Sequence, residues 1–443
     1  MTDRPMLSGQ MPNAFDPARG NLSAEDRDLV ERRAAALGPA YRLFYETPVH
    51  LVRGDGVWLY DADGRAYLDT YNNVASVGHC HPRVVAAMAE QAAVFASHTR
   101  YLHDGILRYA ERLLAYFPPA LGHVMFTCTG SEANDLALRI AQAHTGGTGV
   151  IVTENAYHGV THLIAGMSPS LGSGVTLGSQ VRTIPAPDPL RCSGDVAETF
   201  ASHVRTAIAD MQAQGIRPAA LLVDTIFSSD GVFADPAGFL ALAVDEIRKA
   251  GGIFIADEVQ PGFGRTGTGM WGFARHGVVP DMVTLGKPMG NGYPVAGVVM
   301  RPQVVEKFGA SARYFNTFGG NAVAAATANA VLDVIEDEGL IDNAATVGDH
   351  LRAGLDDLAS RDPSLGPIRA KGLFLGAEIV AVGDPLASDH VHAGRVVNRL
   401  REAGVLISAT GPRANVLKIR PPLTFSRDNA DLFLDRLATA LKR

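Results

Sequence analysis

The sequence predicts an α/β protein built on a mostly parallel sheet. Short apolar runs rich in β-branched residues are bounded by glycine and proline, which is typical of strands buried in such a sheet. Two of these runs end in ionisable residues of opposite sign: the run 252–256 stops at Asp257, and the run 282–286 stops at Lys287. Strand and helix patterns alternate over about residues 124–300, and this alternation indicates a doubly wound sheet.

Composition excludes several classes of protein. The 443 residues are 47% hydrophobic and 19% charged, as in a soluble globular chain. A net charge of −7 without a basic stripe argues against nucleic-acid binding, and no apolar run reaches membrane-spanning length. Three widely spaced cysteines offer neither a disulfide framework nor a metal site, so we expect a reducing compartment, the cytoplasm. The first twenty residues lack a signal-peptide core and are expected to form an arm, mobile or embracing a partner, before a helix capped by Ser23.

The segment after the predicted strand 124–128 is a candidate phosphate site. A turn at Thr129, Gly130 and Ser131 leads into a predicted helix over 132–141. Free backbone N–H groups and the positive end of the helix dipole would face a phosphate there. The alternative is an ordinary helix start, with Ser131 as its cap and no ligand.

The pair Asp257 and Lys287 suggests a cofactor. Open α/β sheets hold their ligands at such strand ends. An amine that forms a Schiff base with an aldehyde, together with a carboxylate that keeps a pyridine nitrogen protonated, suits pyridoxal phosphate (PLP). Of the six lysines, only Lys287 is enclosed by an apolar strand and by following Pro and Gly residues. The alternative is a strand-end lysine whose amine reaches solvent.

Two further loops carry candidate residues. The predicted strand 149–152 leads into Tyr157, His158 and Gly159, where a tyrosine can lie flat on a cofactor ring or be a surface aromatic. His158 has no neighbours with metal-ligand spacing, so we expect no metal. Thr317 precedes a predicted helix and could donate to a phosphate, or merely cap its turn.

These motifs together resemble the class III aminotransferases of PLP fold type I. Their order and spacing match over nearly the whole chain, and the segment 67–82 resembles a narrower branch that includes alanine–glyoxylate aminotransferase 2 and the ethanolamine-phosphate phospho-lyases. The motifs that carry the resemblance are 129–134, 157–159, 257–267, 284–287 and 316–321.

The resemblance implies PLP as cofactor and assigns residue roles. Lys287 would be the Schiff-base lysine and proton shuttle, and Asp257 would pair with the pyridine nitrogen. Tyr157 and Val259 would lie on the two faces of the ring, and Thr317 would reach the phosphate from the second subunit of a homodimer. The full set of cofactor-binding residues is Gly130, Ser131, Tyr157, His158, Asp257, Val259, Gln260, Lys287 and Thr317.

A C-terminal arginine is the candidate for substrate binding. The segment 417–423 resembles the one whose arginine, here Arg420, grips a substrate α-carboxylate, which a planar guanidinium can bind with two hydrogen bonds. The alternative role for Arg420 is a structural salt bridge. Many relatives neutralise this arginine with a glutamate; here Asp224 stands in its place, one methylene shorter, and Phe227 departs from a glutamine-like position.

The expected organisation is a large PLP-binding domain over 76–330 and a smaller α+β domain. The smaller domain would combine residues 1–75, including the arm, with residues 331–443. The expected activity is transfer of an amino group between an amine or amino acid and an oxo acid in a ping-pong cycle. The alternative is elimination of phosphate from a phosphorylated amino alcohol or amino acid. A protein without catalysis is disfavoured, because Lys287 and Asp257 are both present.

Overall fold

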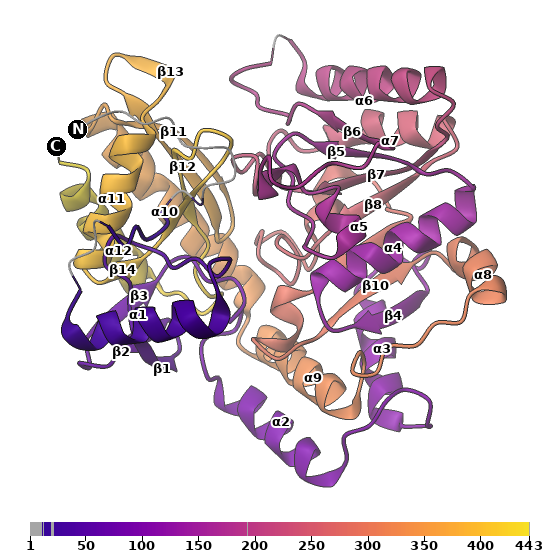
Figure 1. Cartoon of the computed structure of the whole chain (residues 1–443), viewed down its shortest axis with the longest axis horizontal. Helices are drawn as coiled ribbons and strands as arrows, with labels where there is room; N and C mark the ends of the chain where they lie inside the picture. The colour runs from indigo at the N-terminus through magenta and orange to yellow at the C-terminus, as the bar shows by residue number, and fades with distance from the viewer. Residues whose placement is uncertain (1–10, 12, 19–21, 193, 443) are drawn as a thin grey trace.

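The computed structural model describes residue 11 and residues 13–18, 22–192 and 194–442. Most of the expected N-terminal arm, residues 1–10, 12 and 19–21, lies outside the described residues. Figure 1 shows a larger domain beside a smaller one, and the smaller one holds both the first and the last described helices, α1 (Ala24–Leu37) and α12 (Arg427–Ala440).

A seven-stranded sheet forms the centre of the larger domain. Its order is β4-β10-β9-β8-β7-β5-β6. Strand β10 runs antiparallel to both of its neighbours, whereas the pairings from β9 to β6 are parallel. The strands are β4 (His123–Thr127), β5 (Gly149–Thr153), β6 (Val181–Ile184), β7 (Pro218–Asp224), β8 (Ile253–Asp257), β9 (Met282–Leu285) and β10 (Ala296–Met300).

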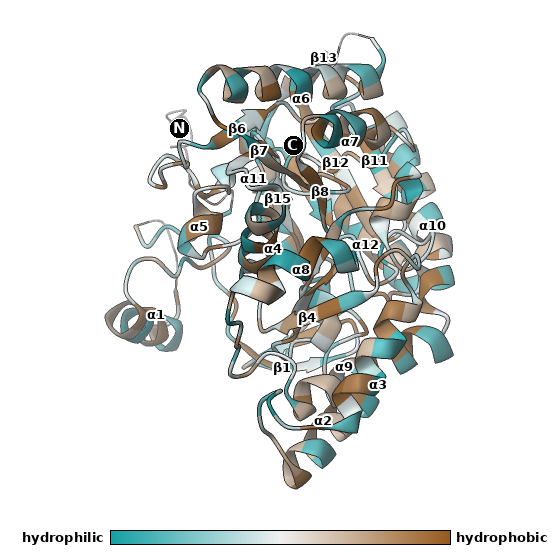
Figure 2. Ribbon diagram, turned by 90° about the vertical axis from the view of Figure 1, so that its right-hand side faces the viewer, coloured by the Kyte–Doolittle hydropathy of each residue, from teal (hydrophilic) through white to brown (hydrophobic). Residues whose placement is uncertain are grey.

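Helices cover both faces of this sheet, because its central strands are buried apolar runs that water must not reach. Figure 2 shows the hydrophobic segments of these helices and strands gathered in the interior. The elements around the sheet are α2 (Pro82–Val94), α3 (Asp104–Ala115), α4 (Gly130–Thr145), α5 (His162–Ala165), η1 (Pro169–Leu171), α6 (Val196–Ala213), α7 (Leu240–Lys249), η2 (Gly272–His276), η3 (Lys287–Gly290), α8 (Pro302–Ser311) and α9 (Ala322–Asp337).

The smaller domain joins the two ends of the chain. Strand β14 (Val405–Leu406) pairs in parallel with β3 (Ala66–Asp69), which completes a sheet with β1 (Leu51–Asp55) and β2 (Trp58–Asp61). A second sheet has the order β11-β12-β16-β15, with β13 beside β12. Its strands are β11 (Leu365–Lys371), β12 (Phe374–Ala381), β13 (Asp384–Ser388), β15 (Ser408–Thr410) and β16 (Val416–Ile419). The helices here are α1 (Ala24–Leu37), α10 (Leu340–Arg361), α11 (His390–Glu402) and α12 (Arg427–Ala440).

The expected fold class is confirmed: a mostly parallel seven-stranded sheet stands beside an α+β unit made from both chain ends. The expected helix start is wrong by two residues. Helix α4 begins at Gly130, and Thr129 rather than Ser131 is its cap. The division at residues 75 and 330 stays a prediction. Among the described helices, none combines the length and apolarity needed to cross a bilayer.

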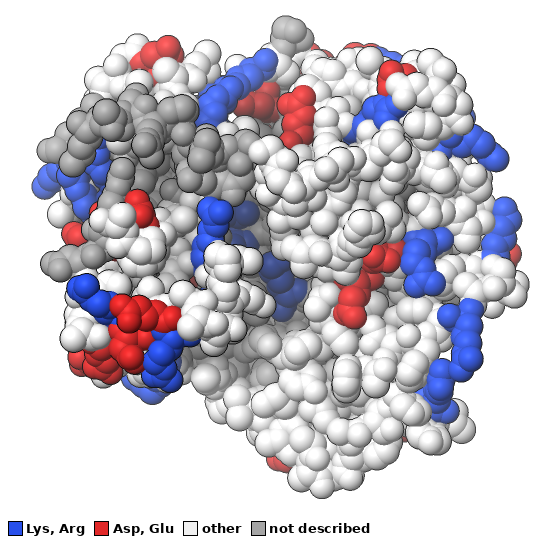
Figure 3. Space-filling model, in the orientation of Figure 1, with Lys and Arg blue, Asp and Glu red and all other residues white. Residues whose placement is uncertain are grey.

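The two domains meet at the carboxyl ends of the central strands. On the face seen in Figure 3, a hollow lies between them, and Lys and Arg side chains are visible in it. Elsewhere on this face, charges of both signs are scattered. The residues that chemistry requires therefore come from both domains to one boundary.

Candidate functional site

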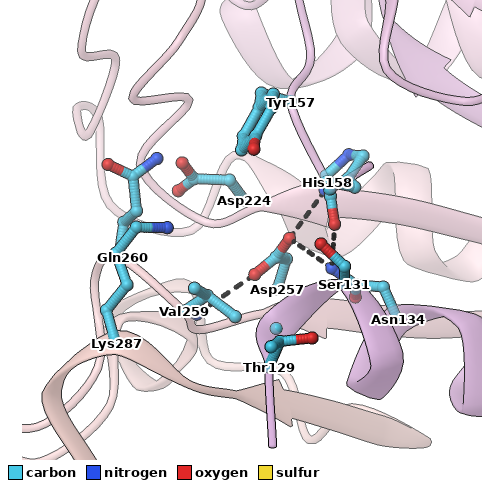
Figure 4. Close-up of a pocket in the computed structure, with 12 residues that line it drawn as sticks. Thr129, Ser131, Asn134, Tyr157, His158, Asp224, Asp257, Val259, Gln260 and Lys287 are labelled. Atoms are coloured by element: carbon cyan, nitrogen blue, oxygen red, sulfur yellow. Dashed lines mark hydrogen bonds and ion pairs between the residues drawn. The ribbon is translucent and has the colours of Figure 1, made fainter. Parts of the chain in front are cut away.

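A cavity of about 200 Å³ lies at the carboxyl ends of β7, β8 and β9. Strand register brings Asp224 beside Asp257, and Asp257 beside Thr284, so the ends of three strands share one edge. Lys287 follows β9 and enters the same cavity (Figure 4). The structure thus brings together the carboxylate and the amine that the sequence singled out.

Asp257 is fixed by three donors. Its Oδ2 accepts a hydrogen bond from Asn134 Nδ2 at 3.0 Å and lies 2.7 Å from His158 Nδ1. Its Oδ1 accepts from the Val259 N–H at 3.1 Å. Because a carboxylate only accepts, His158 Nδ1 carries a proton in this contact. The carboxylate is buried and cannot rotate freely, which suits a group that must present one oxygen to a ligand.

A second row of contacts orients these donors. The Thr284 hydroxyl donates to Asn134 Oδ1 at 2.7 Å, and Asn134 Nδ2 also donates to the His158 carbonyl at 2.8 Å. These bonds fix which end of the amide faces Asp257. His158 Nε2 is buried without a partner among the described residues.

Lys287 opens the short helix η3 directly after β9. Its amine has no hydrogen bond or ion pair within the described part of the chain. Burial lowers the pKa of Lys287, and the positive charge of Arg420 lowers it further, whereas Asp257 and Asp224 act in the opposite direction. A lysine with a lowered pKa is more often neutral, which is the form that attacks a carbonyl or accepts a proton.

The start of α4 forms one wall of the cavity. Thr129 and Glu132 make a capping box, with the Glu132 N–H on the Thr129 hydroxyl at 3.1 Å and the Thr129 N–H on Glu132 Oε2 at 2.9 Å. The N–H groups of Gly130 and Ser131 have no acceptor within the helix. A Cβ on Gly130 would lie 3.0 Å from Val259 Cγ2, so glycine lets the helix start approach the strand ends.

The loop after β5 closes over this helix start. The Val160 N–H donates to Ser131 Oγ at 3.1 Å. Gly159 has φ +135°, and a Cβ there would lie 2.7 Å from Ser131 Cα. Tyr157 precedes it and lines the cavity. In Figure 4, Tyr157 lies on one side of Asp224 and Asp257, and Val259 lies on the other.

Gln260 connects the cavity to Arg420. Its Nε2 donates to Ser228 Oγ, and its Oε1 accepts from Arg420 Nη1. The Arg420 guanidinium also lies 4.3 Å from the centre of the Tyr71 ring, while its Nε is buried without a partner among the described residues. Arg420 itself is not one of the cavity-lining residues.

Asp224 lines the cavity but is occupied by its own turn. Its Oδ1 accepts from the Ile226 N–H and its Oδ2 from the Ser228 N–H, both at 3.0 Å. Burial raises the pKa of Asp224, and the nearby Asp257 contributes in the same direction. In the part of the chain that the structure describes, no ion pair joins Asp224 to Arg420.

Thr317 lies apart from the other predicted residues. It is exposed on the segment before α9 and does not line the cavity of its own chain. All other predicted cofactor residues, namely Gly130, Ser131, Tyr157, His158, Asp257, Val259, Gln260 and Lys287, line it together with Asp224.

Sequence reasoning assigned no role to Asn134 or Thr284. The sequence contained one signal for Asn134. It is a polar residue in the predicted helix, and its neighbours Ala133, Leu136 and Ala137 are apolar. Such a residue is buried only where it finds hydrogen-bond partners. Its partner could not be named, because Thr284 is 150 residues away along the chain.

The residues present fit PLP. A helix start with free N–H groups and a glycine cradle suits a phosphate. A fixed carboxylate suits a pyridine nitrogen, and an unpartnered lysine of lowered pKa suits an aldehyde.

Comparison with known proteins agrees with this fit. The family model "Aminotransferase class-III" matches residues 44–441. A Drosophila melanogaster protein named alanine–glyoxylate aminotransferase 2-like is 40% identical over 94% of this chain and 87% of its own length. An Arthrobacter phospholyase solved in complex with phosphoethanolamine is 42% identical, with a TM-score of 0.90 over 94% of this chain and 99% of that one.

A transaminase from the marine bacterium Virgibacillus is more distant, with 25% identity and a TM-score of 0.85 over 94% of this chain and 98% of that one. Relatives with two different reactions therefore share this fold and nearly the full length of the chain. The chain belongs to the class III aminotransferase family and is a PLP-dependent enzyme.

Proposed function

We propose that the chain transfers an amino group from a small amine or amino acid to an oxo acid. The observation that carries this proposal is the meeting of Lys287 and Asp257 in one cavity, at the ends of neighbouring strands, in a class III chain. The donor leaves its amino group in a first half-reaction, and the oxo acid collects it in the second.

Lys287 and Asp257 divide the chemistry. When bound, PLP supplies an aldehyde carbon for the amine and a ring that accepts electrons. Lys287 Nζ would hold the cofactor and would be the base placed to take the proton from the substrate α-carbon. Its lowered pKa favours the neutral amine that this step requires. Asp257 would keep the pyridine nitrogen protonated, and His158 and Asn134 hold its carboxylate in place.

The remaining cavity residues would position the cofactor. The N–H groups of Gly130 and Ser131 would bind its phosphate, with Tyr157 and Val259 on the two faces of the ring. Gln260 would lie near the ring hydroxyl. The helix start, the glycine cradle and the places of these side chains in the cavity support this assignment.

Arg420 would bind the carboxylate of an amino or oxo acid. Its guanidinium is buried and has no carboxylate partner among the described residues, so an arriving anion would meet an uncompensated charge. Asp224 is held by the N–H groups of Ile226 and Ser228.

Phosphate elimination is the second candidate. The observation that favours it is the 42% identity to the Arthrobacter phospholyase solved with phosphoethanolamine. In that reaction, the electron pair left when Lys287 removes the α-proton would expel phosphate from the neighbouring carbon. Addition of water would then release ammonia and an aldehyde or ketone.

A panel of amines, amino acids and phosphoamines separates the two reactions. Transamination predicts that a donor converts the enzyme to its pyridoxamine form and that an oxo acid restores it. If phosphoethanolamine instead releases inorganic phosphate without an oxo acid, and no donor converts the cofactor, the first proposal is wrong and the second stands.

We also infer that the enzyme is a homodimer whose active sites are shared. Tyr101, Leu102 and Phe318 are 64%, 100% and 69% exposed, and the first two line an apolar cavity of about 320 Å³. Apolar surface of this kind supports a protein interface. Thr317 lies beside Phe318 on this surface and would reach the phosphate of the partner subunit's cofactor. Sedimentation velocity should give the mass of a dimer.

We place the enzyme in the cytoplasm. Cys80, Cys128 and Cys192 are free thiols, as is usual in a reducing compartment. Fractionation of the source cells, with the enzyme found in a membrane-enclosed or external fraction, would contradict this placement.

A further inference from the structure

Three buried cations lie together at the domain boundary. Arg265, Lys418 and Arg420 are 2%, 6% and 7% exposed. Arg265 Nη1 donates to the carbonyl of Pro421, the residue after Arg420, and Lys418 lies two residues before Arg420, so the three belong to one region. Burial lowers the pKa values of both Arg265 and Lys418, and the positive charge of Arg420 lowers them further. No ion pair involves any of them within the described part of the chain. A buried charge without a counter-charge is strongly unfavourable, and this cluster therefore suits an anionic ligand.

Lys418 is placed by strand β16. It pairs with Gly376 of β12 and with Ser408 of β15, so its backbone is fixed in the middle of the sheet. Side chains two residues apart share a face of a strand, which puts Lys418 on the face of Val416 and Arg420. This face packs against the turn after β7: a Cβ on Gly376 would lie 3.0 Å from Val416 and 3.1 Å from Val232. Lys418 therefore lies between the two domains, near the end of β7.

The groups around Lys418 come from four places. Arg420 directly follows its own strand, Asp224 ends β7, Asp230 is in the turn that follows, and Lys287 is after β9. The Lys418 amine also lies 5.6 Å from the centre of the Phe374 ring. Burial lowers the pKa of Lys418 well below its ordinary value, and Arg420 and Lys287 act in the same direction.

Neither nearby carboxylate is committed to Lys418. Asp224 accepts from two backbone N–H groups. Asp230 accepts from the Thr153 hydroxyl at 2.8 Å and the Asn155 N–H at 3.2 Å. Burial raises the pKa of Asp230 to about 7, so it is not a permanent negative charge.

The Lys418 amine is not sealed off. Neither Arg420 Nε nor Lys418 Nζ has a hydrogen-bond partner within the described residues. Arg420 Nε is fully enclosed, whereas Lys418 Nζ is not completely enclosed. Gln260, which both lines the cavity and accepts from Arg420, connects Arg420 to the cavity that Lys287 lines.

We propose that Lys418 is the second cation of the substrate-anion site and that, beside Arg420, it selects a substrate whose anionic group carries two negative charges over one with a single carboxylate. A phosphomonoester is the chemical class that fits. This inference rests on the role of Arg420 given under the proposed function, but it holds for either reaction there. Lys418 acts on specificity and takes no part in proton transfer at the α-carbon.

Anion binding to the holoenzyme tests the inference without turnover. The probes are sulfate, which stays a dianion between pH 6 and 9, and acetate, a monoanion, both measured by isothermal titration calorimetry. In Lys418→Met, we expect sulfate to bind at least about tenfold more weakly and acetate to change by less than about threefold. Lys418→Arg should keep sulfate affinity, and Lys249→Met, which removes an exposed lysine at the end of α7, should change neither.

The pH dependence gives a second readout that a purely structural role would not move. Wild-type affinity for sulfate should fall as pH rises and Lys418 loses its proton, and this slope should disappear in Lys418→Met. Loss of a buried charge should leave the protein folded, which thermal melting checks. The inference would be overturned if Lys418→Met bound sulfate and acetate more weakly by the same factor, or if the folded variant kept the wild-type affinity for sulfate.

The two proposals fail separately. If the substrate panel shows no amino transfer but the affinity for sulfate still depends on Lys418, the proposed reaction is wrong and the anion site stands. If amino transfer occurs and Lys418→Met does not distinguish the two anions, only the present inference falls.

Discussion

Asp257 is held by donors from three separate segments of the chain. Asn134 comes from helix α4, His158 from the loop after β5, and Val259 from the turn after Asp257 itself. In the proposed mechanism, a negative charge fixed in this way would need no rearrangement to pair with the ring nitrogen of PLP. Such preorganised charge is often the largest contribution to catalysis.

The variant Asp257→Asn should lose at least about 10²-fold in kcat, because a neutral amide cannot keep the ring nitrogen protonated. It should still bind PLP, since the phosphate contacts proposed for the start of α4 are untouched. Steady-state kinetics and the visible absorption of the purified variant check both statements. Turnover close to wild type would show that another group holds the ring nitrogen.

Asp230 should make stability depend on pH. Burial raises its pKa from the ordinary 3.8 to about 7 in the folded protein. Between about pH 4 and pH 7, the folded state therefore binds a proton that the unfolded state has released. The free energy of unfolding consequently falls as pH rises through this window.

The variant Asp230→Asn mimics the protonated carboxyl and can keep both hydrogen bonds, because the Thr153 hydroxyl can accept as well as donate. We expect its Tm to exceed that of the wild type at pH 8 and to match it at pH 5. Thermal melts at the two pH values measure this. A Tm difference of the same size at both would contradict the raised pKa.

At the scale of elements, the start of α4 depends on the loop above it. Gly159→Ala should weaken PLP binding at least about tenfold, because its Cβ would lie 2.7 Å from Ser131 Cα and push the loop off the helix start. Gly251→Ala is the matched control: Gly251 also has a positive φ, +84°, but open space at its Cβ. Fluorescence titration of the cofactor-free proteins with PLP compares them. Equal affinities would mean that this contact does not shape the phosphate site.

The elements that carry the site were largely predictable. Strand β8 ends at Asp257 and β9 just before Lys287, as the two apolar runs indicate, because periodicity and flanking glycines are local signals. The cap of α4 was not predicted correctly. Thr129 and Ser131 are both good caps by type, and the choice was made by Glu132, whose side chain returns to the Thr129 N–H.

At the scale of the whole molecule, contacts between segments far apart along the chain could not be predicted from the sequence. The hydrogen bond from Arg420 to Gln260 spans 160 residues and joins the two domains. A role for Arg420 was predicted only from the resemblance to a family, and no role was predicted for Lys418. Burial next to Asp224 and Arg420 is set by how the domains pack, which no local pattern encodes.

If two subunits share their active sites, as proposed above, variants of different subunits should complement each other. Lys287→Ala and Thr317→Asp homodimers should each have little activity, the second because a carboxylate repels the cofactor phosphate. Mixing them under conditions of subunit exchange should restore activity, since one site of each hybrid then has both a wild-type Lys287 and a wild-type Thr317. If Thr317 acted within its own chain, no hybrid site would be intact and the mixture would remain inactive.

The identity of the reactive amine is the most direct test. The holoenzyme is reduced with borohydride, digested, and its peptides are sequenced by mass spectrometry. We expect pyridoxyl on Lys287 and on none of the other five lysines, and we expect Lys287→Ala to lose both the label and turnover. A label on another lysine, or undiminished turnover in Lys287→Ala, would contradict the assignment of Lys287 on which the proposed chemistry depends.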